Sequence, residues 1–346
     1  METKEMDVVP KKKKSQHEQL RDVVLVLASA EKERFGGQSP VQMVVENPFL
    51  FRELIEYLRP SIQKIFVCGG FIGSWNDLKG VKIFTLKDNS WMRGPDMITC
   101  RQNYGIAHVA GHIFVIGGFT DRGRITNSVE AFDVERNEWK EMPPMFTNRN
   151  RPGVGVVDDR IFVFGGDDNS DYLNTCEMFD VRTDKWETIA PMPTMRNDMG
   201  VAVIGDRIIT IGGYNNISGS LRTVEALNMK TNTWTTLPPI LTARWGMAVG
   251  VIDDRFVWTF GGCKVGRALD VIEIFDVEKN EWTKSSSKMT SPRPGAKAVV
   301  IEHKIFIVGG SSSAGRVMEI FDVDMMTWEK SPPMIDPHWY YTAIGF

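Results

Sequence analysis

Residues 153–191 read GVGVVDDRIFVFGGDDNSDYLNTCEMFDVRTDKWETIAP and contain the pattern that decides the fold. The first five residues are apolar or glycine, and Asp158-Asp159 after them suits a two-residue hairpin turn. The run Ile161–Phe164 is continuously apolar and ends at a Gly-Gly doublet, as expected of a strand covered on both faces. The side chains of Cys176–Val181 alternate with period two, which places Glu177, Phe179 and Val181 on one side. Trp186 then begins a short segment that ends at a proline. The stretch therefore predicts four short strands.

The same pattern recurs at a nearly constant spacing along the chain. Gly-Gly doublets begin at intervals of 48, 48, 47, 49 and 48 residues, at Gly69, Gly117, Gly165, Gly212, Gly261 and Gly309. A tryptophan follows each doublet at intervals of 48, 47, 48, 48 and 46 residues, at Trp91, Trp139, Trp186, Trp234, Trp282 and Trp328. Self-similarity with a period of about 20–50 residues is the signature of a repeat architecture. No segment of the repeats sustains a helical apolar period, so the units are expected to be all-β.

These units resemble Kelch repeats, and the resemblance covers residues 64–346. The strand motif Val-Glu-x-Phe-Asp lies between each doublet and its Trp, at Val129–Asp133 and in variants at Cys176–Asp180, Val224–Asn228, Ile272–Asp276 and Met318–Asp322. A Met-x-x-x-Arg lead-in precedes four units, at Met97/Arg101, Met145/Arg149, Met192/Arg196 and Met289/Arg293. Three positions depart from the pattern, namely Lys82 for Glu, Ile240 for Met and His338 for Arg. The resemblance implies a six-bladed Kelch β-propeller, and the units that contain these three departures are expected to be looser copies of the repeat.

The two ends of the repeat region indicate how the ring closes. The first doublet has no inner strand before it, whereas Tyr340–Phe346 is an apolar segment with no unit after it. The C-terminal strand is therefore predicted to complete blade 1, which leaves no open strand edge.

Residues 1–60 carry no repeat marker and are expected to form a tail with short helices. Lys11–Lys14 is a basic run that suits a solvated tail or a nuclear-import signal. Helical patterns occupy Gln19–Arg34 and Pro48–Leu58, the second of them capped by Asn47. Many Kelch propellers follow a BTB domain and a helical BACK domain that recruit a cullin-3 ubiquitin ligase. The segment 48–60 resembles part of such a BACK linker, but the region upstream is too short for a BTB domain.

Composition excludes several classes of protein. The 41 basic and 44 acidic side chains leave a formal net charge of −3, unlike the surplus of Lys and Arg that nucleic-acid binding needs. The longest apolar run, Val23–Ala28, is far shorter than the roughly 20 residues of a membrane span. Four cysteines make no disulfide framework, which favours a reducing compartment, cytoplasmic or nuclear.

No catalytic, metal or cofactor site emerges from the repeats. Glu130, Glu177, Glu225, Glu273 and Glu319 recur once per unit, so five equivalent copies are interpreted as structural. The arginines at 101, 149, 196, 244 and 293 are expected to brace adjacent blades, with the channel as an alternative destination. No Cys/His pair has metal-ligand spacing, and the copper-ligand pattern of propeller oxidases is absent. The chain is therefore expected to be a non-enzymatic protein without cofactors.

Variation between units points to the loops at one face of the ring as a binding site. We expect the residues after each doublet, the loops that follow, and the residues two past each inner-strand Arg to surround the channel mouth. The predicted partner-binding residues are Phe71, Trp75, Asn103, Phe119, Arg122, Arg124, Arg151, Asp167, Asp168, Asp198, Tyr214, Asn215, Arg267, Arg316 and Tyr340. Aromatic side chains and arginines among polar loops are typical of protein-recognition hot spots. Residues 148–157 are similar to a stretch of Kelch-type substrate receptors whose second Arg, here Arg151, meets acidic peptide groups.

Three functions follow from this reading. The first is a protein-binding module that resembles the substrate-recognition propellers of cullin-3 ligase adaptors, with an acidic peptide as one form of ligand. The second is an actin-associated cytoskeletal propeller, which is also a known use of this family. The third, a propeller enzyme, lacks a constellation of catalytic residues. The sequence does not choose between a ligase and actin as partner.

Overall fold

The fold is described here from a computed structural model, for residues 64–69, 79–310, 317–335 and 342–346. The chain divides into two compact units, Met1–Ser61 and Ile62–Phe346. The expected N-terminal tail and helices lie outside the described residues.

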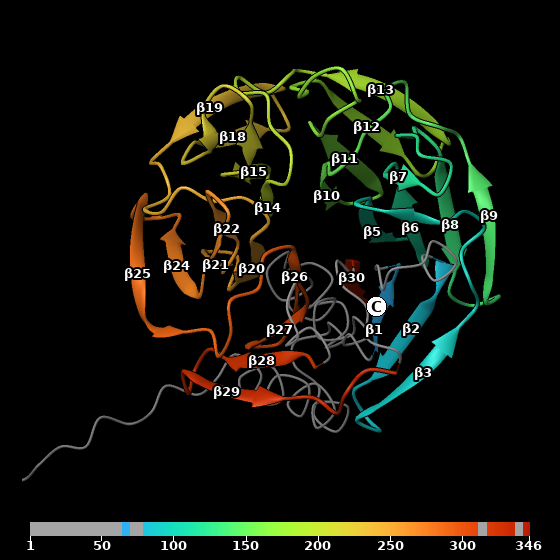
Figure 1. The fold of residues 1–346 in the computed structure, drawn as a ribbon. Helices are drawn as coiled ribbons and strands as arrows, with labels where there is room; N and C mark the ends of the chain where they lie inside the picture. The colour runs from blue at the N-terminus through green and yellow to red at the C-terminus, as the bar shows by residue number, and fades with distance from the viewer. Residues whose placement is uncertain (1–63, 70–78, 311–316, 336–341) are drawn as a thin grey trace, which may run out of the picture. The chain divides into compact units, whose positions relative to one another are not determined.

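The described residues form six four-stranded antiparallel sheets arranged as blades around a central channel (Figure 1). Blade 1 contains β30 (Thr342–Gly345), β1 (Lys64–Cys68), β2 (Val81–Thr85) and β3 (Ser90–Gly94). Blade 2 contains β5 (Gly105–Val109), β6 (His112–Ile116), β8 (Val129–Asp133) and β9 (Glu138–Met142). Blade 3 contains β10 (Gly153–Val157), β11 (Arg160–Phe164), β12 (Cys176–Asp180) and β13 (Lys185–Ile189).

The other three blades repeat this order from the channel outward. Blade 4 contains β14 (Gly200–Ile204), β15 (Arg207–Ile211), β18 (Val224–Asn228) and β19 (Thr233–Leu237). Blade 5 contains β20 (Ala248–Ile252), β21 (Phe256–Phe260), β24 (Val271–Asp276) and β25 (Glu281–Lys288). Blade 6 contains β26 (Ala296–Ile301), β27 (Lys304–Gly309), β28 (Glu319–Asp322) and β29 (Thr327–Lys330).

The C-terminal strand completes blade 1, so the predicted closure is confirmed. Strand β30 pairs antiparallel with β1, with Ala343 opposite Val67, and the sheet order is β3-β2-β1-β30. The backbone groups of Lys64 and Phe346 exchange two further hydrogen bonds at 3.1 and 2.9 Å. The first and last described strands therefore lie in one sheet, which removes the open edge of β1.

The core lies between the blades, and the repeated residues build it. In blade 3, Ile161–Phe164 is buried, as expected for a strand covered on both faces. The third strand is different from its predicted alternation, because β12 buries Cys176, Glu177, Met178 and Phe179 in succession. Hydrogen bonds from Phe146 and Arg149 hold the carboxylate of Glu177 inside the blade. The face of β12 that carries this side chain is therefore covered as well as the opposite face.

The tryptophan of an outer strand holds the blade to the connection that enters it. The indole Nε1 of Trp186 donates to the carbonyl of Pro143 at 2.8 Å, and that of Trp234 donates to Ala190 at 2.9 Å. Equivalent bonds run from Trp91, Trp139 and Trp282 to Pro332, Pro95 and Pro238. In five blades the Trp repeat therefore reflects a repeated hydrogen bond as well as apolar burial, whereas the indole N–H of Trp328 in blade 6 has no partner among the described residues.

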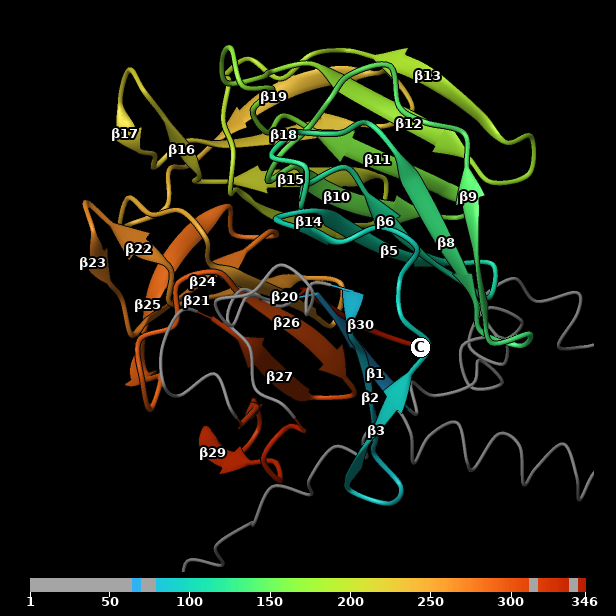
Figure 2. The ribbon, with the colours of Figure 1, turned by 45° about the vertical axis from the view of Figure 1, so that its right-hand side comes forward.

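Three short two-stranded sheets lie at one face of the ring, and we call this side the hairpin face. They pair β4 (Arg101–Gln102) with β7 (Phe119–Thr120), β16 (Tyr214–Asn215) with β17 (Gly219–Ser220), and β22 (Cys263–Lys264) with β23 (Arg267–Ala268). Figure 2 shows the last two standing out from blades 4 and 5. Of the predicted residues, Tyr214, Asn215 and Arg267 thus belong to the two raised hairpins.

Candidate functional site

The repeated Arg and Glu side chains are structural elements of the blades. The guanidinium of Arg149 is fully buried and donates to the carbonyls of Gly165 and Thr175 at 2.8 Å each. It also pairs with Glu177 at 2.9 Å, and Glu177 accepts the backbone N–H groups of Phe146 and Thr147. The backbone of Arg149 belongs to the preceding blade, since its N–H donates to Thr126 at 3.2 Å and its carbonyl accepts the N–H of Gly118 at 2.7 Å. Arg196 and Arg244 are held in the same way, by their backbone to one blade and by their side chain to the next. The expectation that these arginines brace adjacent blades is therefore confirmed for these three, and the glutamates are structural.

The same arrangement repeats around the ring. The buried pairs are Arg101–Glu130, Arg149–Glu177, Arg196–Glu225, Arg244–Glu273 and Arg293–Glu319. All five guanidinium groups are fully buried, so none of them reaches the channel. In blade 1, Lys82 occupies the Glu position and is also buried, at 3% exposure.

The glycine doublet lets these lead-in segments pass close to the blade. Gly166 has a φ of 96°, and a Cβ there would lie 2.6 Å from the carbonyl oxygen of Asn150. Asn150 and Asp167 then exchange backbone hydrogen bonds at 2.8 and 2.9 Å. The doublet thus allows the residue that follows it, here Asp167, to pair with Asn150 of the segment that leads into the blade.

The residues two past each inner-strand Arg meet around the channel mouth, as predicted. Arg151 N–H donates to Asn103 at 2.7 Å, Asp198 to Arg151 at 3.2 Å, Gly246 to Asp198 at 2.8 Å, and Gly295 to Gly246 at 2.7 Å. All five have a positive φ, between 48° and 77°. We call these five residues the mouth ring. Its backbone conformation suits glycine, yet three of its members carry polar or charged side chains.

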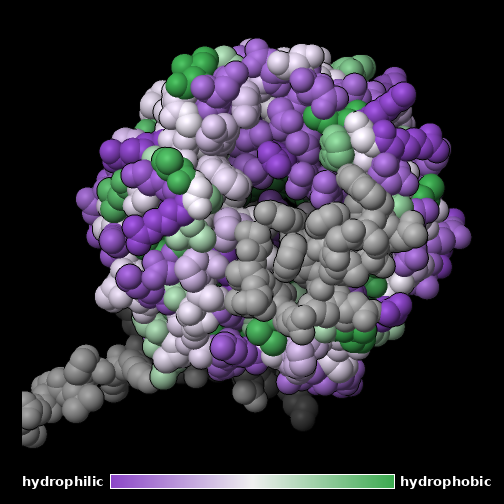
Figure 3. Space-filling model, in the orientation of Figure 1, coloured by the Kyte–Doolittle hydropathy of each residue, from purple (hydrophilic) through white to green (hydrophobic). Residues whose placement is uncertain are grey.

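A pocket of 480 Å³ lies on the hairpin face beside the mouth ring. Blades 3, 4 and 5 build it, and hairpins β16–β17 and β22–β23 form its outer wall. Its lining residues are Arg151, Tyr172, Asn197, Asp198, Tyr214, Gly219, Ser220, Trp245, Val265 and Gly266. Figure 3 looks onto this face and shows a hollow at its centre, with hydrophilic residues gathered over the blades at the top of the view.

Aromatic rings give the pocket its apolar surface. The rings of Tyr172 and Tyr214 lie 5.9 Å apart, centroid to centroid, and are tilted by 53°. Trp245 is partly exposed in the next blade, where its backbone bridges to Cys263. Val265, at the tip of the β22–β23 hairpin, is 86% exposed. The pocket therefore offers three aromatic side chains from three blades around one opening.

Charged groups lie at the inner end of the pocket. Arg151 Nε is 3.4 Å from a carboxylate oxygen of Asp198, and the Arg151 side chain remains 42% exposed. Burial raises the pKa of Asp198, while Arg151 and Lys297 oppose that rise. Burial also raises the pKa of Tyr172. The Arg151 guanidinium is thus paired on one side and open to the pocket on the other.

Asp167 supports the pocket from behind. Its carboxylate accepts the side-chain amide of Asn150 at 3.0 Å and that of Asn197 at 2.7 Å. Two neighbouring lead-in segments are thereby joined through one carboxylate. The role visible in the structure is to position Asn197 in the pocket wall.

The structure distributes the predicted partner-binding residues over several places. Arg151, Asp198 and Tyr214 line the pocket, and Asn103 lies in the mouth ring. Asp168 and Asn215 hold their own loops, since each side chain accepts backbone N–H groups two and three residues on. Arg122, Arg124 and Arg267 are exposed on other parts of the hairpin face, and Phe119 lies in β7. Phe71, Trp75, Arg316 and Tyr340 lie outside the described residues.

Seven residues of the pocket wall were not among those predicted: Tyr172, Asn197, Gly219, Ser220, Trp245, Val265 and Gly266. Trp245 carried a usable signal, because it falls outside the 48-residue tryptophan period and stands next to an inner-strand Arg. Tyr172 and Val265 lie in loops whose lengths differ between units, so their positions follow from the folded hairpins rather than from the repeat.

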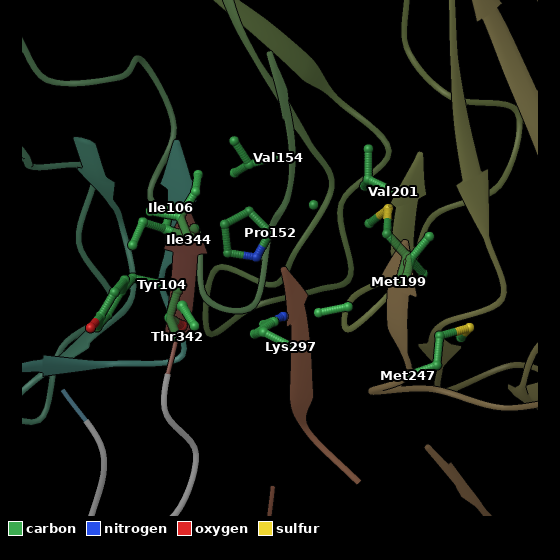
Figure 4. A pocket seen from close by; sticks show the side chains of 16 residues that line it. Tyr104, Ile106, Pro152, Val154, Met199, Val201, Met247, Lys297, Thr342 and Ile344 are labelled. Atoms are coloured by element: carbon green, nitrogen blue, oxygen red, sulfur yellow. The ribbon is translucent and has the colours of Figure 1, made fainter. Parts of the chain in front are cut away.

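The central channel contains a second hollow, of 190 Å³, lined by inner strands of all six blades. Figure 4 shows Ile106, Val154, Val201 and Ile344 around it, with the amino group of Lys297 among them. Most of the lining side chains are apolar, although polar atoms make up the larger part of the exposed wall, and Lys297 is the charged side chain among the lining residues.

A comparison with family models bears on this geometry. The model described as the KLHDC2/KLHL20/DRC7 Kelch-repeats domain matches residues 59–257 and, in a second overlapping segment, residues 192–338. The chain belongs to this Kelch-repeat family. No curated protein matches the sequence at a significant level. The family match and the six sheets together establish the Kelch propeller expected from the repeats.

The described part of this Kelch propeller holds no group of three or more metal-ligating side chains. Its four cysteines are buried and free, and burial raises the pKa of the Cys68 and Cys176 thiols to about 12. Such thiols remain protonated and make poor nucleophiles. Within the same residues, no helix has the length and apolar character to cross a bilayer.

Proposed function

We propose that this Kelch propeller is a non-enzymatic protein-binding module that holds a peptide segment of its partner in the pocket on the hairpin face. One observation carries the proposal: Tyr172, Tyr214 and Trp245 surround an opening that also contains the exposed part of Arg151. Aromatic anchors beside an arginine are the composition of interface hot spots. The exposed tips Ile217 and Val265, at 74% and 86% exposure, extend the apolar surface beyond the pocket.

The backbone of Arg151 supports the same site. Its φ of 53° is unfavourable for a side chain with a Cβ, and the equivalent mouth-ring residues Gly246 and Gly295 adopt the conformation without that cost. Residues held in such conformations concentrate at functional sites. A long, partly exposed cation at a glycine-like position is best explained by a ligand that uses it.

The finer proposal is that the partner is a ubiquitin-ligase substrate and that the propeller is a substrate-recognition module of the cullin-3 adaptor type. The resemblance of residues 148–157 to Kelch-type receptors supports it, since Arg151 lies in the pocket wall. Affinity capture of the full chain from cells, followed by mass spectrometry, tests it. Cullin and ligase subunits support the ligase role, whereas capture of actin and co-sedimentation with actin filaments would replace it with the cytoskeletal role.

Two substitutions test the pocket itself. A charge-assisted arginine hydrogen bond contributes about 1.5–3 kcal/mol, so Arg151→Ala should weaken binding of a captured partner roughly 10- to 150-fold. Tyr214→Ala should weaken it as well, and neither substitution should change the melting temperature by more than a few degrees. Arg122→Ala, on the separate exposed loop of blade 2, is the matched control. Equal affinity of both pocket variants and wild type would place the partner site elsewhere.

A further inference from the structure

One inner-strand position differs between blades in a way that neither the fold nor the pocket explains. It is the residue paired with the last residue before each glycine doublet. From blade 1 to blade 6 this position holds Thr342, Gly105, Gly153, Gly200, Ala248 and Lys297. A lysine therefore replaces a small residue at a place where the strands line the channel.

The neighbouring blades explain why the position is usually small. A Cβ on Gly153 would lie 2.7 Å from a methyl group of Val201, and one on Gly200 would lie 2.5 Å from a methyl group of Val249. These valines come from the inner strand of the next blade. The corresponding residue next to Lys297 is Ala343 in β30, which leaves space for a longer side chain.

The surroundings of Lys297 leave its charge without a direct partner. Among the described residues, Lys297 forms no ion pair, and the one titratable group that affects its pKa is Asp198. Asp198 pairs instead with Arg151 at 3.4 Å, while the nearby carboxylate of Asp167 is held by two asparagine amides. Burial lowers the pKa of Lys297, and Asp198 opposes that change. Lys297 is partly exposed toward a hollow that no other charged side chain lines among the described residues, so an anion is the ligand whose charge matches this site.

We propose that the channel is a carboxylate-binding site in which the Lys297 amino group donates to an anionic oxygen. The hollow of 190 Å³ admits an acidic side chain or a small organic acid. Arg151 and Asp198 line the neighbouring pocket, and the residues that follow them, Pro152 and Met199, line the hollow, so the two openings adjoin at the mouth ring. The hairpin face is therefore the side from which we expect an acidic side chain to reach the channel. The site does not require that the adjacent pocket bind a protein.

Protection of the amino group from chemical labelling tests the site directly. The full chain is methylated with formaldehyde and cyanoborohydride, and labelling at each lysine is measured by mass spectrometry. Propionate represents the free acid, and an acetylated, amidated peptide with one glutamate represents the side chain. Either probe should slow labelling of Lys297 several-fold and leave the exposed Lys264 unchanged. Protection by propionate alone assigns a small acid, and protection by the peptide assigns a side chain.

Propionamide is the neutral control for this experiment. It has the size of propionate without the charge, so it should not protect Lys297. Equal protection by propionamide, equal protection of Lys264, or no protection by either carboxylate would overturn the proposal.

Substitution separates a binding role from a structural one. Lys297→Met keeps the length of the side chain and removes the charge, so its melting temperature should equal or exceed that of wild type. Propionate should raise the melting temperature of wild type and of Lys264→Met but not of Lys297→Met. A lower melting temperature in Lys297→Met with undiminished stabilisation by propionate would make the lysine purely structural.

Failure of this proposal is distinguishable from failure of the proposed function. Tyr214→Ala should lose the protein partner and retain stabilisation by propionate, because Tyr214 lines the pocket and not the channel. Loss of propionate stabilisation in Tyr214→Ala would contradict the separation of the two sites.

Discussion

Substitution of Glu177 should show how much the buried charge pairs contribute to the stability of the blades. Glu177 is 2% exposed and accepts Arg149 together with the backbone N–H groups of Phe146 and Thr147, at 2.7 and 3.1 Å. Glu177→Ala leaves the guanidinium of Arg149 buried without its counter-ion and two N–H groups without an acceptor. Breaking a buried pair in this way costs about 3–5 kcal/mol.

The expected change in melting temperature follows from that cost. At about 2 °C per kcal/mol for a large domain, Glu177→Ala should melt roughly 6–10 °C below wild type. The double variant Arg149→Met/Glu177→Leu removes the pair as a unit and should recover part of the loss, because no lone charge stays buried. Thermal unfolding followed by circular dichroism measures both variants.

A surface pair in the same blade provides the control. Arg182 and Asp159 also form an ion pair, but their side chains are 76% and 33% exposed. Asp159→Ala should cost less than about 1 kcal/mol, since exposed pairs contribute little. If Glu177→Ala and Asp159→Ala destabilise the protein equally, the buried network does not hold the blade.

Three further predictions concern other parts of the ring. Deletion of residues 340–346 should lower the melting temperature sharply and promote aggregation, because β1 would become an open edge; an unchanged melt would contradict the closure. Arg151→Gly should keep the unfolding free energy within about 1 kcal/mol of wild type, because relief of the positive φ offsets the lost ion pair, while partner binding falls as in Arg151→Ala. His303 lies 3.0 Å from Asp324, and this hydrogen bond raises its pKa above the ordinary 6.5. Its stabilising contribution is therefore complete below pH 6.5 and lost as the pH rises through the higher native pKa; between pH 6 and 8, wild type should lose up to about 1 kcal/mol more than His303→Gln in denaturant titrations.

The repeat made the blades predictable from the sequence. The glycine doublet, the Glu strand and the Trp recur because each meets a structural need of the repeated unit. At Gly166, for example, the backbone has a positive φ and passes close to the carbonyl of Asn150. The common period of these three features then determined the number of blades, and the unmatched segments at the two ends indicated that the C-terminal strand pairs with β1. The mouth ring was predictable for the same reason, since it lies at a constant distance from each inner-strand Arg.

The candidate sites depended on contacts that the repeat does not encode. Asn215 and Arg151 look alike in sequence as polar loop residues, yet one turns inward to hold its hairpin and the other opens to the pocket. Tyr172 and Trp245 are 73 residues apart and line one pocket only because blades 3, 4 and 5 follow one another around the ring. The sequence by itself determined the architecture, because the same residues recur at one period and each unit therefore packs against the next in the same way. Only the tertiary structure decided which variable residues share a pocket and that Lys297 faces the channel, because those neighbours belong to different blades and their distances depend on how the ring closes.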